Sequence, residues 1–333
     1  MRTGKISENV LKRSVLKRCH AKAENMVQGP GVGRDCAIFH IEGEKDLMTS
    51  VSTVIGQMEP GKTAGLVRQG ICHTANNLLC GGGIPTAVSL SVTLPVQAEE
   101  VLLREIMDSA DSSCEEIGIA LAGGHTLVTE TVSAPVIGIS AVGTAEDRRE
   151  KKLVPGFDLV MTGWAGMEGT ALLAREEEER LRQRFSLDLV ATAQTFDSKL
   201  YLGKEAQIAW DCQAAALHDV SEGGIFGALW EFCESQQVGL EAKLKKIPLK
   251  QETVEICELL GLNPYCLLSG GALLAAVPDG QRLVTELSKE GIPAVLIGRT
   301  TEKREKVLRN GEECRFLEKP ARDEIWNIRD GEK

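Results

Sequence analysis

The chain has 333 residues, of which 43% are hydrophobic, 26% are charged and only 4% are aromatic, and its formal net charge is -10. This length and apolar content suffice for a large core and about two domains. The acidic balance argues against a nonspecific grip on nucleic acid or anionic membranes, because both depend on clustered Lys and Arg. Small metabolites and proteins are the partners that this composition favours.

The cysteines and the N-terminal residues point to a reducing compartment. Ten cysteines are scattered along the chain without C-x-x-C spacing, so neither a zinc site nor a dithiol site is indicated. We interpret them as reduced packing residues. The first residues lack the apolar core of a signal peptide, and no window has the uninterrupted apolar run of a membrane span. We therefore expect a cytoplasmic protein without a membrane partner.

The first half of the chain alternates strand-like and helix-like segments. We expect strands at 36–41, 47–53, 86–94 and 135–142, and helices at 63–79 and 98–117. The second of these helices has a Glu-rich first turn, which the helix dipole favours. The pattern is typical of an α/β domain.

A charged run at 146–152, followed by Pro155-Gly156, predicts a domain boundary. We expect one domain over 1–150 and another over 151–333. The second domain begins with a strand at 158–162 and has further strands expected at 272–277 and 294–297. It is therefore also read as α/β.

The stretch 217–231 combines short polar residues, paired glycines and an amphipathic helix. Asp219 or Ser221 could cap the helix, while Gly223 and Gly224 would let its first amides approach a ligand. This arrangement predicts a site for a phosphate or a carboxylate. An ordinary capped helix with glycines used for tight packing is the alternative.

A glycine-rich turn at 29–35 contains Gly31 and Gly33, then Arg34 and Asp35, and feeds a strand. A ligand-binding turn and a flexible turn that needs positive φ are both compatible with it. His125 follows Gly123-Gly124 after a strand expected at 119–122, a position where α/β proteins place ligand contacts. It could be a base or a donor, or a structural histidine.

A pair of neutral amides, Asn76 and Asn77, is expected at the end of the helix over 63–79, just before a flexible break at Gly81-Gly82-Gly83. Taken alone, this pattern is typical of a helix terminus. Several such pieces occur in a fixed order, which is more specific than any one of them. They are Gly4-Lys5-Ile6, Gly31-x-Gly33-x-Asp35, Asn76 with Gly83-Ile84-Pro85, Gly123-Gly124-His125-Thr126, Pro155-Gly156, Gly166-Met-Glu-Gly-Thr170, His218-Asp219, Leu268-Ser-Gly-Gly and Ile297-Gly-Arg299.

With these motifs over nearly its whole length, the chain resembles the aminoimidazole-ribonucleotide (AIR) synthetase superfamily, and within it the related proteins that look like the hydrogenase maturation factor HypE. The resemblance implies a two-domain α/β (α+β) fold. Strands of the N-terminal domain would pair with a second subunit into a barrel, giving a homodimer, and the C-terminal domain would be an α/β sandwich. It also implies that ATP and magnesium bind and that ATP activates an amide or acid oxygen.

The resemblance also implies roles for individual residues. Asp35, Asp219 and His125 would be catalytic, and Asp35 and Asp219 would hold the metal. The residues that would bind the nucleotide or another phosphorylated molecule are Gly31, Gly33, Arg34, Asn76, Asn77, Ser221, Glu222, Gly223 and Gly224.

Several acids of the related enzymes are replaced in this chain, by Arg34, Ser52, Asn77 and His125. Because attraction for Mg²⁺ is largely coulombic, the affinity for magnesium should fall, and Arg34 is expected to contact phosphate directly. The last cysteine is Cys314, so the carbamoyl chemistry of the maturation factor, which needs a C-terminal cysteine, is not expected. A catalytically degenerate nucleotide-binding or regulatory protein, and a scaffold that binds a maturation-factor protein, stay open as alternatives.

Overall fold

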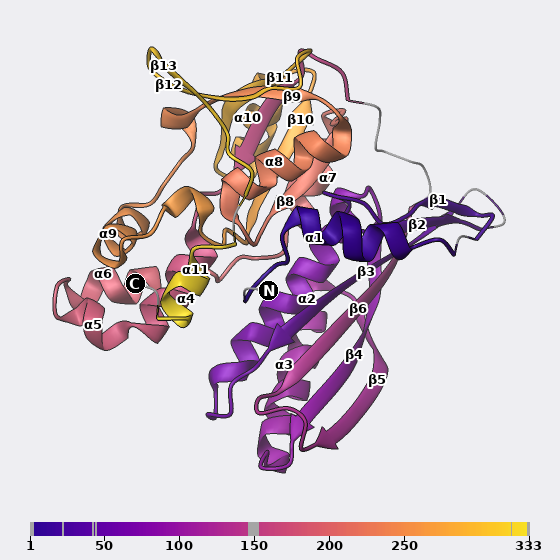
Figure 1. Cartoon of the computed structure of the whole chain (residues 1–333), viewed down its shortest axis with the longest axis vertical. Helices are drawn as coiled ribbons and strands as arrows, with labels where there is room; N and C mark the ends of the chain where they lie inside the picture. The colour runs from indigo at the N-terminus through magenta and orange to yellow at the C-terminus, as the bar shows by residue number, and fades with distance from the viewer. Residues whose placement is uncertain are drawn as a thin grey trace. The chain divides into compact units, whose positions relative to one another are not determined.

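The computed structural model describes residues 3–21, 23–41, 43, 45–145, 153–320 and 322–331 (Figure 1). Contacts divide the chain into two compact units, which we name after their central helices. The α2 unit comprises Lys22–Gly29 and Asp35–Arg148, and the α8 unit comprises Met1–Ala21, Pro30–Arg34 and Arg149–Lys333. The N-terminal segment and the turn at 30–34 thus cluster with the second half of the chain, whereas the expected domain boundary at residue 150 assigns them to the first domain. The charged run 146–152 lies outside the described residues.

The α2 unit contains a six-stranded sheet in the order β1-β2-β3-β6-β4-β5. Its strands are β1 (Met26–Gln28), β2 (Ala37–His40), β3 (Asp46–Ile55), β4 (Ile84–Pro95), β5 (Ala120–Thr129) and β6 (Val136–Ala145). The helices α2 (Lys62–Cys80) and α3 (Glu100–Ile117) cover one face and share a buried core with it. Because side chains alternate along each strand, the other face carries the exposed residues.

The edge strand β5 departs from the expected pattern. A strand over 119–122 was expected, with His125 after its end, but β5 continues through these residues to Thr129. Gly124 is needed there because a Cβ atom would lie 1.8 Å from the carbonyl oxygen of Leu90 in β4. Here the glycine marks a close approach of two strands rather than a break.

The α8 unit contains a seven-stranded sheet in the order β13-β12-β9-β11-β7-β10-β8. Its strands are β7 (Asp158–Thr162), β8 (Ala216–Val220), β9 (Gly239–Lys243), β10 (Ala272–Val277), β11 (Ala294–Thr301), β12 (Lys306–Asn310) and β13 (Glu313–Phe316). The predictions of strands at 158–162 and 272–277 are confirmed. Apart from the parallel pair β9 and β12, the strands pair antiparallel.

The longest helix of the α8 unit, α8 (Gly224–Gln236), packs its apolar side chains against Ala272, Leu274 and Ala276 of β10. The alternate residues of β10 are equally buried, and α7 (Gly203–Asp211) and α10 (Gly280–Lys289) contact this strand. The sheet is therefore covered on both faces.

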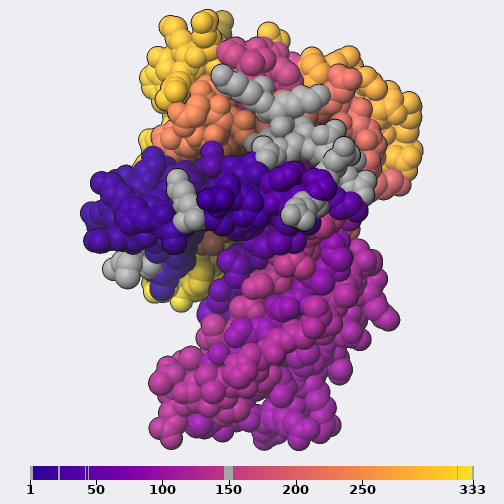
Figure 2. Space-filling view, turned by 90° about the vertical axis from the view of Figure 1, so that its right-hand side faces the viewer, coloured from indigo at the N-terminus to yellow at the C-terminus, as the bar shows by residue number. Residues whose placement is uncertain are grey.

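Shorter elements complete the α8 unit. They are α1 (Glu8–Val10), η1 (Leu11–Val15), η2 (Leu16–Arg18), α4 (Met167–Glu176), α5 (Glu178–Arg182), α6 (Leu187–Ala193), η3 (Leu244–Lys246), α9 (Gln251–Leu260), η4 (Pro264–Cys266) and α11 (Ile325–Arg329). The N-terminal segment, indigo in Figure 2, lies at the molecular surface. Among the described residues, none of the helices has the length and apolar character needed to cross a bilayer.

Candidate anion-binding site along helix α8

Helix α8 begins at a pair of glycines, and the expected caps do not cap it. Its N-cap is Gly223, with φ +91°, and no side chain of that residue can bond the first turn. Asp219 lies instead inside β8, where it is buried. Gly224 has φ +62°, and a Cβ atom there would lie 2.6 Å from the carbonyl oxygen of Tyr265. The prediction that Asp219 or Ser221 caps α8 was therefore wrong, because the chain turns through both glycines before the helix starts.

A carboxylate from the far end of the chain occupies the start of α8. The amide of Gly223 donates to Asp323 Oδ2 at 2.6 Å, and the amide of Ile325 donates to Asp323 Oδ1 at 2.9 Å. Burial raises the pKa of Asp323 to about 7, and nearby Glu222 adds to the rise, while its backbone donors oppose it. The helix start does attract a carboxylate, as its dipole and free amides favour, and that carboxylate belongs to the protein itself.

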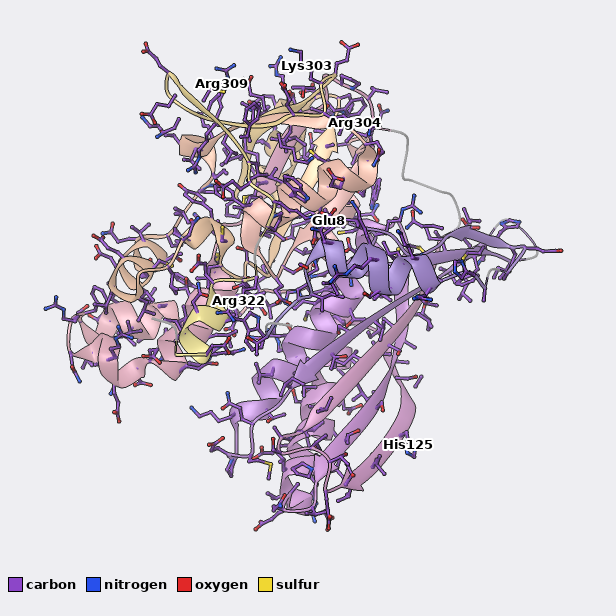
Figure 3. The ribbon with its side chains drawn as sticks, viewed as in Figure 1. Glu8, His125, Lys303, Arg304, Arg309 and Arg322 are labelled. Atoms are coloured by element: carbon purple, nitrogen blue, oxygen red, sulfur yellow. The ribbon has the colours of Figure 1, made fainter. Side chains whose placement is uncertain are left out.

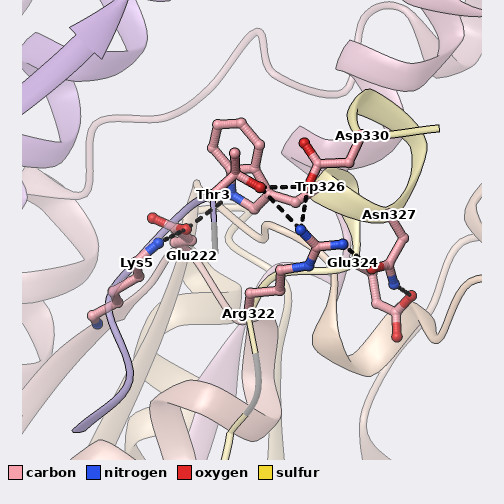
Figure 4. A network of polar contacts seen from close by, with 8 residues as sticks. All are labelled: Thr3, Lys5, Glu222, Arg322, Glu324, Trp326, Asn327 and Asp330. Atoms are coloured by element: carbon pink, nitrogen blue, oxygen red, sulfur yellow. Dashed lines mark hydrogen bonds and ion pairs between the residues drawn. The ribbon is translucent and has the colours of Figure 1, made fainter. Parts of the chain in front are cut away.

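Glu222, one residue before Gly223, joins the two ends of the chain. Its Oε1 accepts from the amide of Lys5 at 2.9 Å and from Trp326 Nε1 at 3.1 Å (Figure 4). Gly4, with φ +85°, packs so closely on this indole that a Cβ atom would lie 2.5 Å from Trp326 Nε1. The backbone of the N-terminal segment is therefore fixed beside the beginning of α8.

Two turns further along α8, Glu231 holds a second set of polar contacts. Lys5 Nζ lies 2.6 Å from Glu231 Oε1, and His218 Nε2 lies 3.6 Å from Glu231 Oε2. Burial alone would raise the pKa of Glu231, but His218 and the Lys5 ammonium outweigh it and hold that pKa below its usual value. Glu231 is therefore a carboxylate with a cation on one side and an imidazole on the other.

The glycine turn also rests on Glu231. Gly33 has φ +65°, and a Cβ atom there would lie 2.3 Å from the carbonyl oxygen of Glu231. The exposed Arg34 folds its stem back over Gly31, where a Cβ atom would be 2.8 Å from Arg34 Cδ. We call Lys5, Gly33, His218 and Glu231 the Glu231 cluster. It brings together the motifs Gly4-Lys5, Gly31-x-Gly33 and His218-Asp219 within one unit.

In the α2 unit, two of the residues that replace acids, Ser52 and Asn77, bond neutral side chains between β3 and α2. Ser52 Oγ lies 2.5 Å from Thr74 Oγ1. Asn77 Nδ2 donates to Ser50 Oγ at 2.9 Å, and Ser50 Oγ donates to the carbonyl oxygen of Asp35 at 3.0 Å. These polar side chains therefore bond across β3 and α2. We call Ser50, Ser52, Thr74 and Asn77 the neutral layer.

Two other predicted site residues stand in different surroundings within the α2 unit. Asn76 is buried inside α2, which ends at Cys80, one residue beyond the predicted end of the helix. His125 lies on the exposed strand β5 opposite Ser91 (Figure 3). The structure thus places His125 in mid-strand, on the uncovered face, rather than at a strand end.

Sequence reasoning missed Lys5, Glu231 and Asp323 as residues of this region. Lys5 and Glu231 were inside quoted motifs but received no role, and a lysine paired with a glutamate has no signature of its own. Asp323 gave no local signal, because it is 100 residues from Gly223 in the sequence.

The domain descriptions of one protein family match both halves of the chain. The N-terminal domain of AIR synthase related proteins matches residues 33–145, and the C-terminal domain matches residues 154–310. The chain belongs to the AIR synthase related family. The first matched range contains β2 to β6 of the six-stranded sheet, and the second contains β7 to β12 of the seven-stranded sheet.

Among curated AIR synthase related proteins, the chain is 27% identical to a putative hydrogenase expression/formation protein of Methanocaldococcus jannaschii, over 92% of this chain and 90% of that one. It is 28% identical to the carbamoyl dehydratase HypE of Rhizobium leguminosarum bv. viciae, over 80% and 76%. A crystal structure of HypE from E. coli is 25% identical, with a TM-score of 0.71 over 85% of this chain and 88% of that one. HypE solved in complex with ATP shares the fold at 16% identity, with a TM-score of 0.66 over 97% of each chain.

Proposed function

We propose that the chain binds ATP or another phosphorylated small molecule along α8 and uses ATP to activate an amide or acid oxygen. The observation that carries the proposal is the Glu231 cluster, in which a lysine, a glycine turn and the His218-Asp219 strand meet on one helix. Cationic side chains and glycine backbones are the groups that bind phosphates in proteins. The relatives named carbamoyl dehydratase, and a HypE solved with ATP, support the same class of ligand.

The residues take the following places in this proposal. Lys5, which the sequence did not single out, and Arg34 supply positive charge, and the glycine turn supplies close backbone approach. The amide of Gly223 already donates to Asp323, so the roles of Ser221, Glu222, Gly223 and Gly224 stay predictions of the resemblance. Asp219 and Asp35 are the carboxylates that would handle protons or the metal, and Asp35 directly follows Arg34 in the chain. Asn76, Asn77 and His125 stay predictions of the resemblance.

The neutral layer of the α2 unit fits magnesium poorly. Mg²⁺ binds through carboxylates and substrate phosphates, whereas the neutral layer offers hydroxyl and amide groups that already bond one another. We therefore assign no step to the metal. Nucleotide affinity should depend only weakly on magnesium, with Lys5 and Arg34 neutralising the phosphates instead.

Isothermal titration with ATP and ADP, with magnesium and with a chelator, tests this proposal. We expect ATP to bind in both conditions, with similar affinity. A chain that also releases ADP when offered amide or acid substrates is an enzyme; binding without turnover supports the regulatory alternative. Absence of nucleotide binding in every condition would overturn the proposal.

The uncovered face of the α2 sheet supports a homodimer as part of this proposal. Val51, Ile55, Ile84 and Val142 share this face by strand register and are 69%, 55%, 67% and 40% exposed. Large exposed apolar patches are uncommon on monomers. A second copy of this chain would cover the face. Light scattering should show a dimer that Ile84→Asp dissociates, while Val254→Asp, at an exposed residue of α9, leaves it intact.

A scaffold role in metallocofactor assembly is the second candidate, favoured by the hydrogenase-related names of the relatives. Purification from native cells should then recover a hydrogenase maturation protein bound to the chain. Its repeated absence would count against this role. A cytoplasmic location belongs to the same proposal, since the cysteines of this chain, all within the described ranges, form no disulfides and thiols persist in a reducing compartment.

A further inference from the structure

Lys5 lies along the side of α8, and its backbone amide and its side-chain ammonium contact different residues of this region. Its amide is bonded to Glu222 at the start of the helix, and its ammonium reaches Glu231 further along. The neighbouring Thr3 is bonded to Arg322 and Asp330, and Gly4 is packed on Trp326 (Figure 4). The backbone at Lys5 and before it is thus anchored, while the side chain reaches along α8 to Glu231.

That ion pair is open to solvent at its lysine end. The Lys5 side chain is 48% exposed, whereas the Glu231 side chain is 19% exposed. When Lys5 turns away, Glu231 keeps His218 as its other partner, so its carboxylate is not left without a compensating neighbour. A phosphate oxygen offers the ammonium a charge-assisted hydrogen bond in place of the one to Glu231.

The position of the ammonium matches the ligand proposed above. Glu231, which holds it, also carries the glycine turn through the contact with Gly33. An anion bound by the turn at 31–34 would therefore lie beside the residue that holds the Lys5 ammonium.

We infer that Lys5 is an anion-binding residue whose ammonium is held by Glu231 in the free protein and transfers to a phosphate of the bound ligand. This inference rests on the proposed function. It adds a second cation, from the N-terminal segment, to a site that the motifs would build from glycines, acids and Arg34.

Titrations with ATP, tripolyphosphate and adenosine separate this role from a structural one. Lys5→Met should weaken ATP and tripolyphosphate binding about tenfold or more and leave adenosine binding unchanged, since a charge-assisted bond to phosphate contributes on the order of 1.5–3 kcal/mol. Lys5→Arg should keep most of the affinity. Glu231→Gln removes the competing carboxylate and should strengthen tripolyphosphate binding severalfold.

Lys12→Met is the matched control, because Lys12 is a lysine of the same segment that pairs with Glu8. It should leave all three affinities unchanged. If the wild-type protein binds ATP and Lys5→Met binds it equally well, the role of Lys5 is refuted while the proposed function stands. If the wild-type protein binds none of the three molecules, the proposed function itself is refuted, and this inference with it.

Discussion

The α8 unit and the α2 unit differ in the charge of the polar side chains at their motifs. In the α8 unit, charged side chains meet around Glu231 and at the start of α8, where Lys5 and Asp323 make their contacts. In the α2 unit, Ser50, Ser52 and Asn77 form a neutral layer. The α8 unit therefore presents charged groups that can recognise an anion, whereas in the α2 unit the neutral polar side chains are hydrogen-bonded to one another.

This difference bears on how an anionic ligand would be neutralised. A set of carboxylates attracts a divalent cation, which then bridges the phosphates. Where those acids are replaced by Ser and Asn, the cation loses much of its coulombic attraction, and protein cations must take over. The comparison thus predicts that ligand binding is more sensitive to changes in the α8 unit than to changes in the neutral layer.

The largest effect is expected for the turn that rests on Glu231. Gly33→Ala combines left-handed backbone, at φ +65°, with a Cβ atom 2.3 Å from a carbonyl oxygen. Gly311→Ala has the same backbone demand, at φ +68°, with no atom within 4 Å. Gly311→Ala, the control, should lose about 1–2 kcal/mol of unfolding free energy. Gly33→Ala should lose about 3 kcal/mol or more, and its affinity for the ligand should fall as well.

Denaturant unfolding of both variants, followed by circular dichroism, measures the difference. An extra loss for Gly33→Ala shows that the turn is held against α8 in solution. Equal losses in the two variants would mean that the turn does not rest on Glu231, and the α8 unit would lose one of the motifs that define its site.

A smaller effect is expected from pH at the start of α8. Asp323 has its pKa raised to about 7 in the folded chain, from 3.8, so the folded state holds a proton that the unfolded state lacks. Stability from this group is therefore full at low pH and falls as pH rises through 7. Between pH 6 and 8 the wild type should lose about 1.4 kcal/mol relative to Asp323→Asn.

Asp330→Asn is the control for this titration. The pKa of Asp330 is lowered by Thr3 and Arg322, so its ionisation is complete well below pH 6. The difference between wild type and Asp330→Asn should stay flat from pH 6 to 8. A flat difference for Asp323→Asn as well would show that the carboxylate at Gly223 is ionised throughout, held by its backbone donors.

Local patterns predicted the elements of the fold, while contacts distant in sequence could not be predicted. The strand at 158–162 and the helix beginning near Gly223 follow from periodicity and turn residues. The role of Gly124 could not be predicted, because only the structure shows the β4 carbonyl that it must accommodate. Asp323 was missed for a similar reason, since nothing in 322–331 signals the helix start that it meets.

The smallest effect tests the neutral layer directly. Asn77→Asp places a carboxylate against Ser50, whose only hydroxyl hydrogen is already given to the Asp35 carbonyl. The new carboxylate lacks a donor there, so the variant should lose about 1 kcal/mol of unfolding free energy in a chelator. Asn310→Asp, at an exposed position of β12, should lose nothing.

Adding Mg²⁺ to the Asn77→Asp variant then shows whether the neutral layer replaces a metal site or serves only to pack β3 against α2. If added Mg²⁺ restores the stability of Asn77→Asp and strengthens its ATP binding relative to the wild type, the missing charge was the reason for weak metal binding. If Mg²⁺ changes neither, the layer serves to hold β3 against α2. The cations of the α8 unit would then carry phosphate recognition alone, because adding an acid to the α2 unit would not bring a metal to the ligand.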